Sequence, residues 1–251
     1  MLVSQYNHIL VVLSFVVAIL AAYTALNMAA RVAGSQGVAA RVWLAGGGIA
    51  MGIGVWAMHF IGMLAMNMSM NMRYEPVLTG LSMAIAIGSS LFALWLVSAP
   101  KLHLRRLIPG SVVMGLGIAA MHYTGMAALQ VSPPIVWHKG WIALSIVIAL
   151  AASFAALWLT FRLRHEAAQV ALMRFGAAIL MGLAITGMHY TGMMAAQIPF
   201  QHHHIAMVHH GFNNNWLAVL VSMMAFSVLG ITLLVSMFDA RLQAVSYTHL
   251  R

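Results

Sequence analysis

Seven long apolar segments constrain the fold of this chain more than any other feature. Each is close to the ~20 residues that a helix needs to cross the hydrocarbon core of a bilayer. Only 6% of the 251 residues are charged, whereas about 25% is usual in a soluble domain. Because backbone groups in lipid must be satisfied internally, we predict an all-α polytopic membrane protein. The predicted spanning helices cover residues 8–30, 41–64, 77–98, 108–129, 141–161, 171–195 and 216–238.

Basic residues fall on alternate connections between the predicted helices. Only Arg73 and Lys139 lie on one side of the predicted membrane. The other side carries Arg31, Arg41, Lys101, Arg105, Arg106, Arg162, Arg164, Arg174, Arg241 and Arg251. Cytoplasmic loops carry an excess of Lys and Arg, so we predict an outside N-terminus and a cytoplasmic C-terminus. The net charge of +9 then reflects membrane topology, and no nucleic-acid partner is expected.

A short motif recurs near the end of every second predicted helix. Its copies read Met58-His59-Phe60-Ile61, Met121-His122-Tyr123-Thr124 and Met188-His189-Tyr190-Thr191. A Met-Gly pair precedes each copy by one to two helical turns, and a Gly-Met pair follows it. We therefore predict three helix-pair repeats and one further helix, with the histidines at one depth in the outer leaflet. Small residues permit close helix approach, so the glycines are expected to bring the three motif helices together.

The motif histidines are the principal candidates for function. Ionisable residues inside spanning helices are costly and mark functional sites by default. A methionine four residues after each histidine shares its helix face. The chain has no cysteine, and imidazole with thioether donors suits copper better than zinc, calcium or magnesium. The predicted metal ligands are Met58, His59, Met63, Met121, His122, Tyr123, Met126, Met188, His189, Tyr190 and Met193.

Three weaker metal-capture candidates lie on the predicted outer side. Residues 66–72 alternate methionine with small polar residues, and His8 begins the first helix. The connection between the last two helices carries His202, His203, His204, His209 and His210. Loop histidines are often simply solvated, and methionines often only fill space in a core.

The motif copies resemble the signature of the MHYT domain, a bacterial integral-membrane sensor module. The resemblance covers about residues 8–238 and implies a seven-helix domain in the bacterial inner membrane. It also implies copper-mediated sensing of O2, CO or NO. The positions it carries over are Met58, His59, Met121, His122, Tyr123, Met188, His189 and Tyr190. Phe60 and Ile61 depart from the family's Tyr-Thr, so no hydroxyl role is expected in the first copy.

The same resemblance implies a cytoplasmic output. Family members often continue into domains that make or degrade cyclic di-GMP, or into histidine kinases or regulators. We expect residues 239–251 to be a short cytoplasmic tail that is truncated, with the output in a missing domain or a partner protein.

Two other functions stay open beside the sensor. Histidines on facing helices could hold haem in a membrane redox protein. The Met- and His-rich loops also suit copper transport or acquisition, although the inner helix halves offer few ligands beyond Met51, Met114 and Met181. No hydrolytic triad or nucleotide-binding loop is evident, so the chain itself is not expected to be an enzyme.

Overall fold

The computed structural model describes residues 5–67, 73–131, 134–164, 168–197 and 212–248. Within these ranges all seven predicted helices form, and all seven are long and apolar enough to cross a membrane. They are α1 (His8–Gly34), α2 (Gly37–Leu64), α3 (Pro76–Val97), α4 (Leu104–Ala127), α5 (Lys139–Leu163), α6 (Ala168–Met194) and α7 (Asn214–Thr248). The chain is therefore an all-helical membrane protein, apart from a few very short strands.

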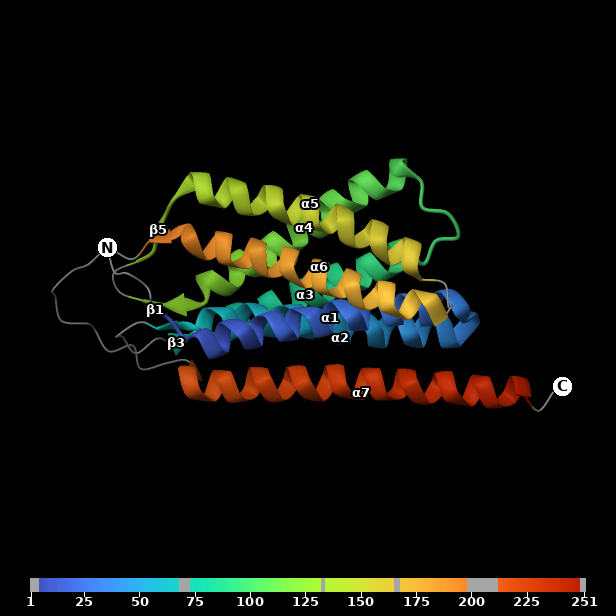
Figure 1. Cartoon of the computed structure of the whole chain (residues 1–251). Coiled ribbons are helices and arrows are strands. Elements are labelled where there is room, and N and C mark those ends of the chain that lie inside the picture. The colour runs from blue at the N-terminus through green and yellow to red at the C-terminus, as the bar shows by residue number, and fades with distance from the viewer. Residues whose placement is uncertain (1–4, 68–72, 132–133, 165–167, 198–211, 249–251) are drawn as a thin grey trace.

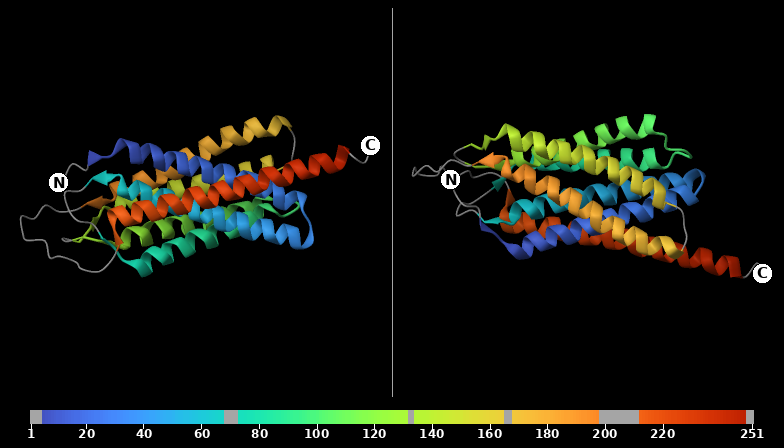
Figure 2. Two further views of the ribbon diagram at one scale, coloured as in Figure 1. Left: turned by 90° about the horizontal axis from the view of Figure 1, so that it is seen from below. Right: turned by 45° about the horizontal axis from the view of Figure 1, so that its top comes forward.

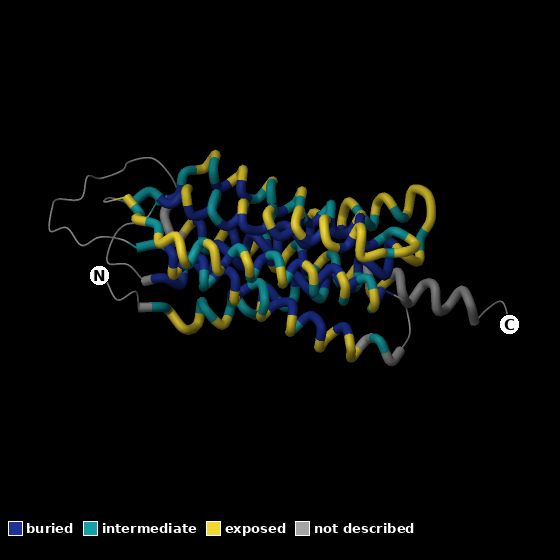
Figure 3. Tube along the Cα trace, turned by 90° about the horizontal axis from the view of Figure 1, so that it is seen from above, coloured by how far each residue is buried: buried dark blue, intermediate teal, exposed yellow. Residues whose placement is uncertain are grey.

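Helices α1 to α6 form a closed ring. Each helix contacts the next one along the chain, and α6 returns to contact α1 (Figures 1 and 2). Helix α7 lies outside this ring, along α2 and α1, and its C-terminal end extends past the other helices (Figure 1). The buried residues gather between the ring helices, and the exposed ones face outward (Figure 3).

In each helix pair, a two-residue strand before the first helix lies against a two-residue strand after the second helix. All pairings are antiparallel: β1 (Gln5–Tyr6) with β2 (Met66–Asn67), β3 (Arg73–Tyr74) with β4 (Leu129–Gln130) and with β7 (Phe212–Asn213), and β5 (Val136–Trp137) with β6 (Ala196–Gln197). In each pair, the residue before the first helix donates its N–H to a carbonyl after the second. These bonds join Asn7 to Ala65 (2.7 Å), Glu75 to Ala128 (2.8 Å) and His138 to Ala195 (2.9 Å). Segments this short carry no alternating pattern, so the sequence does not predict them.

Helix boundaries differ from the hydropathy prediction mainly where the first turn is polar or the turn is tight. Helix α4 begins at Leu104 rather than 108, because its first turn carries Arg105 and Arg106. Helix α2 begins at Gly37, whose φ of +59° completes a very short connection from α1. Side chains cap two helices: Asn7 accepts from the N–H of Ile9 at 3.0 Å, and Glu75 does the same for α3.

Glycines in the even-numbered helices set the helix spacing. A Cβ at Gly52 would lie 2.5 Å from the Cα of Ile87 in α3. Gly115 lies against Leu150 of α5, and Gly182 against Ile19 of α1, at matching positions. We expected these glycines to bring α2, α4 and α6 together. The structure instead uses them to seat each of these helices on the odd-numbered helix that is its neighbour in the ring.

Candidate metal centre

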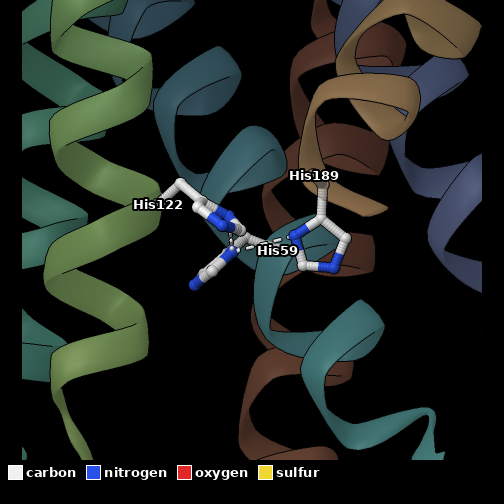
Figure 4. Close-up of side chains that lie close together, drawn as sticks. All are labelled: His59, His122 and His189. Atoms are coloured by element: carbon white, nitrogen blue, oxygen red, sulfur yellow. Dashed lines mark hydrogen bonds between the residues drawn. The ribbon is translucent and has the colours of Figure 1, made fainter. Parts of the chain in front are cut away.

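Three histidines from three helices meet in the middle of the ring. His59 of α2, His122 of α4 and His189 of α6 are all fully buried (Figure 4). The Nδ1 atom of His59 lies 3.1 Å from Nδ1 of His122 and 3.1 Å from Nδ1 of His189. One ligand nitrogen from each ring lies within 4.8 Å of the other two. The sequence predicts a shared depth, and the closed ring is what makes the three side chains converge.

The outward nitrogen of each imidazole rests against a glycine of another motif. A Cβ at Gly125 would overlap Nε2 of His59, and a Cβ at Gly192 would overlap Nε2 of His122. Gly62 completes the cycle against Nε2 of His189. Each motif therefore supplies a histidine to the centre and, three residues later, the space for a neighbouring ring.

The Nε2 atoms have no other partner in the described part of the chain. All three are buried without a hydrogen bond. A lone pair on Nδ1 requires the proton of a neutral imidazole to sit on Nε2. Packing against glycine thus leaves the three Nδ1 atoms as the atoms that face one another.

The motif tyrosines hydrogen-bond to serines on odd-numbered helices. The hydroxyl of Tyr123 lies 2.6 Å from Oγ of Ser145, and that of Tyr190 lies 2.9 Å from Oγ of Ser14. Each serine is the seventh residue of its helix. The ligand role predicted for the tyrosines stays a prediction, and sequence reasoning missed the serines, whose only signal is this shared spacing.

The first motif has a different arrangement at the same place. Phe60 offers no hydroxyl, and the matching serine, Ser82 of α3, accepts instead from Nε1 of Trp56 at 3.1 Å. This indole therefore takes the place of the missing phenol.

A second aromatic residue covers each motif aromatic from the strand end of the bundle. Tyr6 lies against Tyr190 and Tyr74 against Phe60, with ring centroids 5.9 and 5.7 Å apart. Trp137 covers the third, Tyr123, at 5.7 Å. Tyr74 is fully buried, and burial raises the pKa of its phenol.

The predicted methionine ligands all lie in the core. Met58, Met63, Met121, Met126, Met188 and Met193 are each at most 3% exposed. Their ligand role stays a prediction. Thr191 bonds back to the carbonyl of Gly187 within its own helix at 2.7 Å.

Most of the weaker candidates stand apart from the cluster or outside the described ranges. His8 is exposed at the start of α1. In the alternating run, Met66 and Asn67 form β2 and the remainder is not described. The histidines at 202–204, 209 and 210 also lie outside the described residues.

An apolar cavity of about 30 Å³ lies along the middle of the ring, lined by residues that precede the histidines on their helices. Val55, Ile118 and Ile185 line it four residues before the histidines. Met51, Met114 and Met181 line it four residues further on, which is about 12 Å from the histidines along each helix. Among the described residues that line it, Ser153 alone has a polar side chain. A water needs two to four polar partners, so this cavity suits an apolar occupant.

The spacing of the histidine nitrogens fits a metal ion. Three nitrogens held at ~2.0–2.1 Å from one ion stand about 3.3–3.6 Å apart, and the two separations that Nδ1 of His59 makes with its neighbours are close to this, at 3.1 Å each. Without an ion, Nδ1 of His59 is either one hydrogen-bond donor or one acceptor, yet it has two neighbouring Nδ1 atoms. It therefore cannot form a good hydrogen bond with both of them. An ion between the rings would use all three lone pairs.

Comparison with known proteins identifies the family. Residues 52–110 and 115–173 each match the MHYT repeat, described as a bacterial signalling protein N terminal repeat. The chain is 53% identical over 244 residues to the bifunctional diguanylate cyclase/cyclic di-GMP phosphodiesterase MucR of Pseudomonas aeruginosa. This match covers 97% of the chain and 36% of MucR.

Two further relatives are matched over shorter regions. They are the signaling protein YkoW of Bacillus subtilis (39% identical) and the cyclic di-GMP phosphodiesterase NbdA of P. aeruginosa (40%). Each match covers 76% of this chain and 24% of the relative. The chain thus spans about a third or less of the length of these relatives, and no solved structure matches it. On these matches and its motifs, the chain belongs to the MHYT family of bacterial membrane signalling proteins.

Proposed function

We propose that this chain is a membrane sensor module that holds a copper ion at His59, His122 and His189 and responds to O2, CO or NO. The observation that carries the proposal is the convergence of three Nδ1 atoms from three different helices in a fully buried site, where Nδ1 of His59 lies 3.1 Å from each of the other two. Burying ionisable groups without a salt-bridge partner in a membrane costs free energy, and binding an ion would be a function that explains their presence there.

The surroundings favour copper over zinc. No carboxylate joins the histidine group among the described residues. Histidines that bind any metal almost always donate their second N–H to a carboxylate, carbonyl or water, so the Nε2 atoms, which here face glycines, do not distinguish copper from zinc. Monovalent copper also brings the smallest charge into a site that has no anion. Buried methionines before and after each histidine provide soft donors of the kind that Cu(I) prefers.

Bound copper would supply an open coordination position for a diatomic gas. The surrounding residues would position the imidazole rings and give the gas access to the site. Gly62, Gly125 and Gly192 fix the three imidazole rings by close packing. The apolar cavity beside the cluster gives an uncharged gas a place to dissolve next to the site.

The proposed output runs through α2 and α7. Helix α2 carries His59, and a Cβ at Gly54 of α2 would lie 3.2 Å from a Leu229 methyl group of α7. Among the α7 side chains that the structure describes, the buried ones are Leu217, Val221, Ala225 and Leu229. A gas that binds two packings of α2 with different affinity would shift α7 between them.

We further propose three copies of one helix-pair unit, with an outside N-terminus in the bacterial inner membrane. The matching bonds of Asn7, Glu75 and His138 support the three copies. The basic residues at the α1–α2, α3–α4 and α5–α6 connections support the orientation, because cytoplasmic ends are basic. The signal would pass to a cytoplasmic domain or partner that makes or degrades cyclic di-GMP, as the names of MucR and NbdA suggest for those relatives. Any such activity would belong to the output domain and not to this chain.

Metal analysis of the purified protein tests this proposal. Plasma mass spectrometry should find about one copper per chain after copper-replete growth, and none in the His59→Ala/His122→Ala/His189→Ala variant. The matched control is His8→Ala, an exposed histidine outside the cluster, which should keep its copper. Absence of copper from the wild type would refute the metal centre.

A haem centre is the less favoured alternative. The rings contact one another directly, and the adjoining cavity of about 30 Å³ is far too small for a porphyrin. A Soret band in the purified protein would reverse this preference.

Copper transport is favoured by one observation. Met51, Met114 and Met181 line the axial cavity and also a second one of about 10 Å³ beyond it, so soft ligands continue along the axis. Uptake of copper by proteoliposomes, lost in a Met114→Leu variant, would support transport over sensing.

A further inference from the structure

A groove of about 620 Å³ opens between the end of α3 and the beginning of α4. It lies at the opposite end of these helices from the histidine cluster. Its walls include Phe92 and Trp95 of α3 and Arg105, Arg106 and Val113 of α4. It has no part in the proposed metal centre.

The groove changes from charged to apolar along its length. Arg105 and Arg106 lie in the first turn of α4 and are exposed. Val113 lies eight residues after Arg105, about 12 Å deeper along the helix axis. Trp95 is 62% exposed and Val113 54% exposed, so the apolar part faces outward where lipid surrounds a spanning helix. This arrangement matches an amphiphile with its polar end at the membrane surface.

No acidic side chain lies beside the two arginines among the described residues that line the groove. The chain has three acidic residues, and Glu75, the one whose side chain the structure describes, does not line the groove. An occupant that carries a phosphate would therefore supply the missing negative charge. Guanidinium groups bind phosphate oxygens in a bidentate manner, which makes arginine well suited to this role.

We propose that this groove binds one anionic phospholipid. Its phosphate would lie at Arg105 and Arg106, and an acyl chain would lie along Phe92, Trp95 and Val113. Basic pockets between spanning helices are a known way of recognising anionic headgroups. A free phosphate would contact only the arginines, whereas a lipid uses both parts of the groove.

Lipid binding to the detergent-purified protein tests the proposal. Native mass spectrometry should show preferential binding of phosphatidylglycerol over phosphatidylcholine. The Arg105→Gln/Arg106→Gln variant should bind phosphatidylglycerol roughly 25-fold more weakly, about fivefold for each arginine. The matched control is Arg41→Gln, which removes an exposed arginine at the same end of the bundle but outside the groove and should change nothing.

A second variant separates a lipid from a free anion. Val113→Trp fills the apolar part of the groove and should weaken phosphatidylglycerol binding while both arginines remain. Equal binding of the two lipids, or an equal loss in Arg41→Gln, would overturn the proposal. Competition by inorganic phosphate with no effect of Val113→Trp would also overturn it, in favour of a simple anion site. Unchanged thermal unfolding shows that each variant folds, and because this readout needs no bound metal, the test is independent of the metal centre.

Discussion

Gly125 of α4 lies directly against the Nε2 atom of His59 of α2, leaving no room for a Cβ between them. The same relationship joins Gly192 to His122 and Gly62 to His189. The histidine of each motif thus packs against the glycine of a second motif, and its own glycine packs against the histidine of the third. Packing alone therefore explains why a glycine follows every motif histidine by three residues.

Gly125→Ala should therefore displace His59 and abolish copper binding. Overpacking of a dense core costs about 1–3 kcal/mol, so the melting temperature in detergent should also fall. Gly187→Ala is the control, because nothing lies within 4 Å of a Cβ at that helical position. The control should keep its copper and its melting temperature. Full copper occupancy in Gly125→Ala would show that the imidazole does not need this contact.

Tyr123→Phe tests whether the motif phenol is a ligand or a positioning group. The change removes the 2.6 Å bond to Ser145 and should cost about 0.5–1.5 kcal/mol of stability. Copper content should not change, since the first motif already has Phe60 at this position. Loss of the metal in Tyr123→Phe, as measured by plasma mass spectrometry, would make the hydroxyl a ligand after all.

Tyr74→Phe should leave the protein as stable as before or more stable. The hydroxyl of Tyr74 is buried and has no hydrogen-bond partner within the described ranges. Burying an unpartnered polar group costs about 1–3 kcal/mol, and phenylalanine removes that cost while keeping the ring on Phe60. Thermal unfolding in detergent measures the change. A clear drop in melting temperature would reveal a polar contact that this hydroxyl makes.

Arg164→Gln should destabilise the bundle. The Arg164 guanidinium donates to the carbonyls of Val97 (2.6 Å), Ala99 (2.7 Å) and Pro100 (3.1 Å), so it ties the end of α5 to the end of α3. Charge-assisted bonds are worth about 1.5–3 kcal/mol each, and a fall of several degrees in melting temperature is expected.

The control for this prediction is Arg162→Gln. Arg162 is exposed and stacks over Trp158 at 5.6 Å. Such a contact is worth about 0.5–1 kcal/mol at an exposed site, so the melting temperature should change little. Equal losses in the two variants would assign the effect to net charge and not to the bonds of Arg164.

Hydropathy and the motif spacing predict the seven helices and the shared depth of His59, His122 and His189. They do not predict that the three rings touch, because that depends on α6 closing against α1, which no local pattern encodes. The serine partners were missed for a similar reason. Ser14 and Ser145 are ordinary small residues in apolar helices until the packing of neighbouring helices gives them a tyrosine. The role of Gly52 was mistaken because a single helix shows its small face but not which neighbour occupies it.

The position of α7 has a consequence for how the three histidines differ. All three face one point in the ring, yet of the three motif helices only α2, the helix of His59, lies along α7 in the described part of the chain. Loss of any one imidazole should impair ligand capture to a similar degree. The movement of α7 should differ between the three variants. A displacement of α2 acts on α7 directly, whereas a displacement of α4 reaches α7 only through other helices of the ring. Metal binding and signal transmission are therefore separable by substitutions made at one histidine at a time.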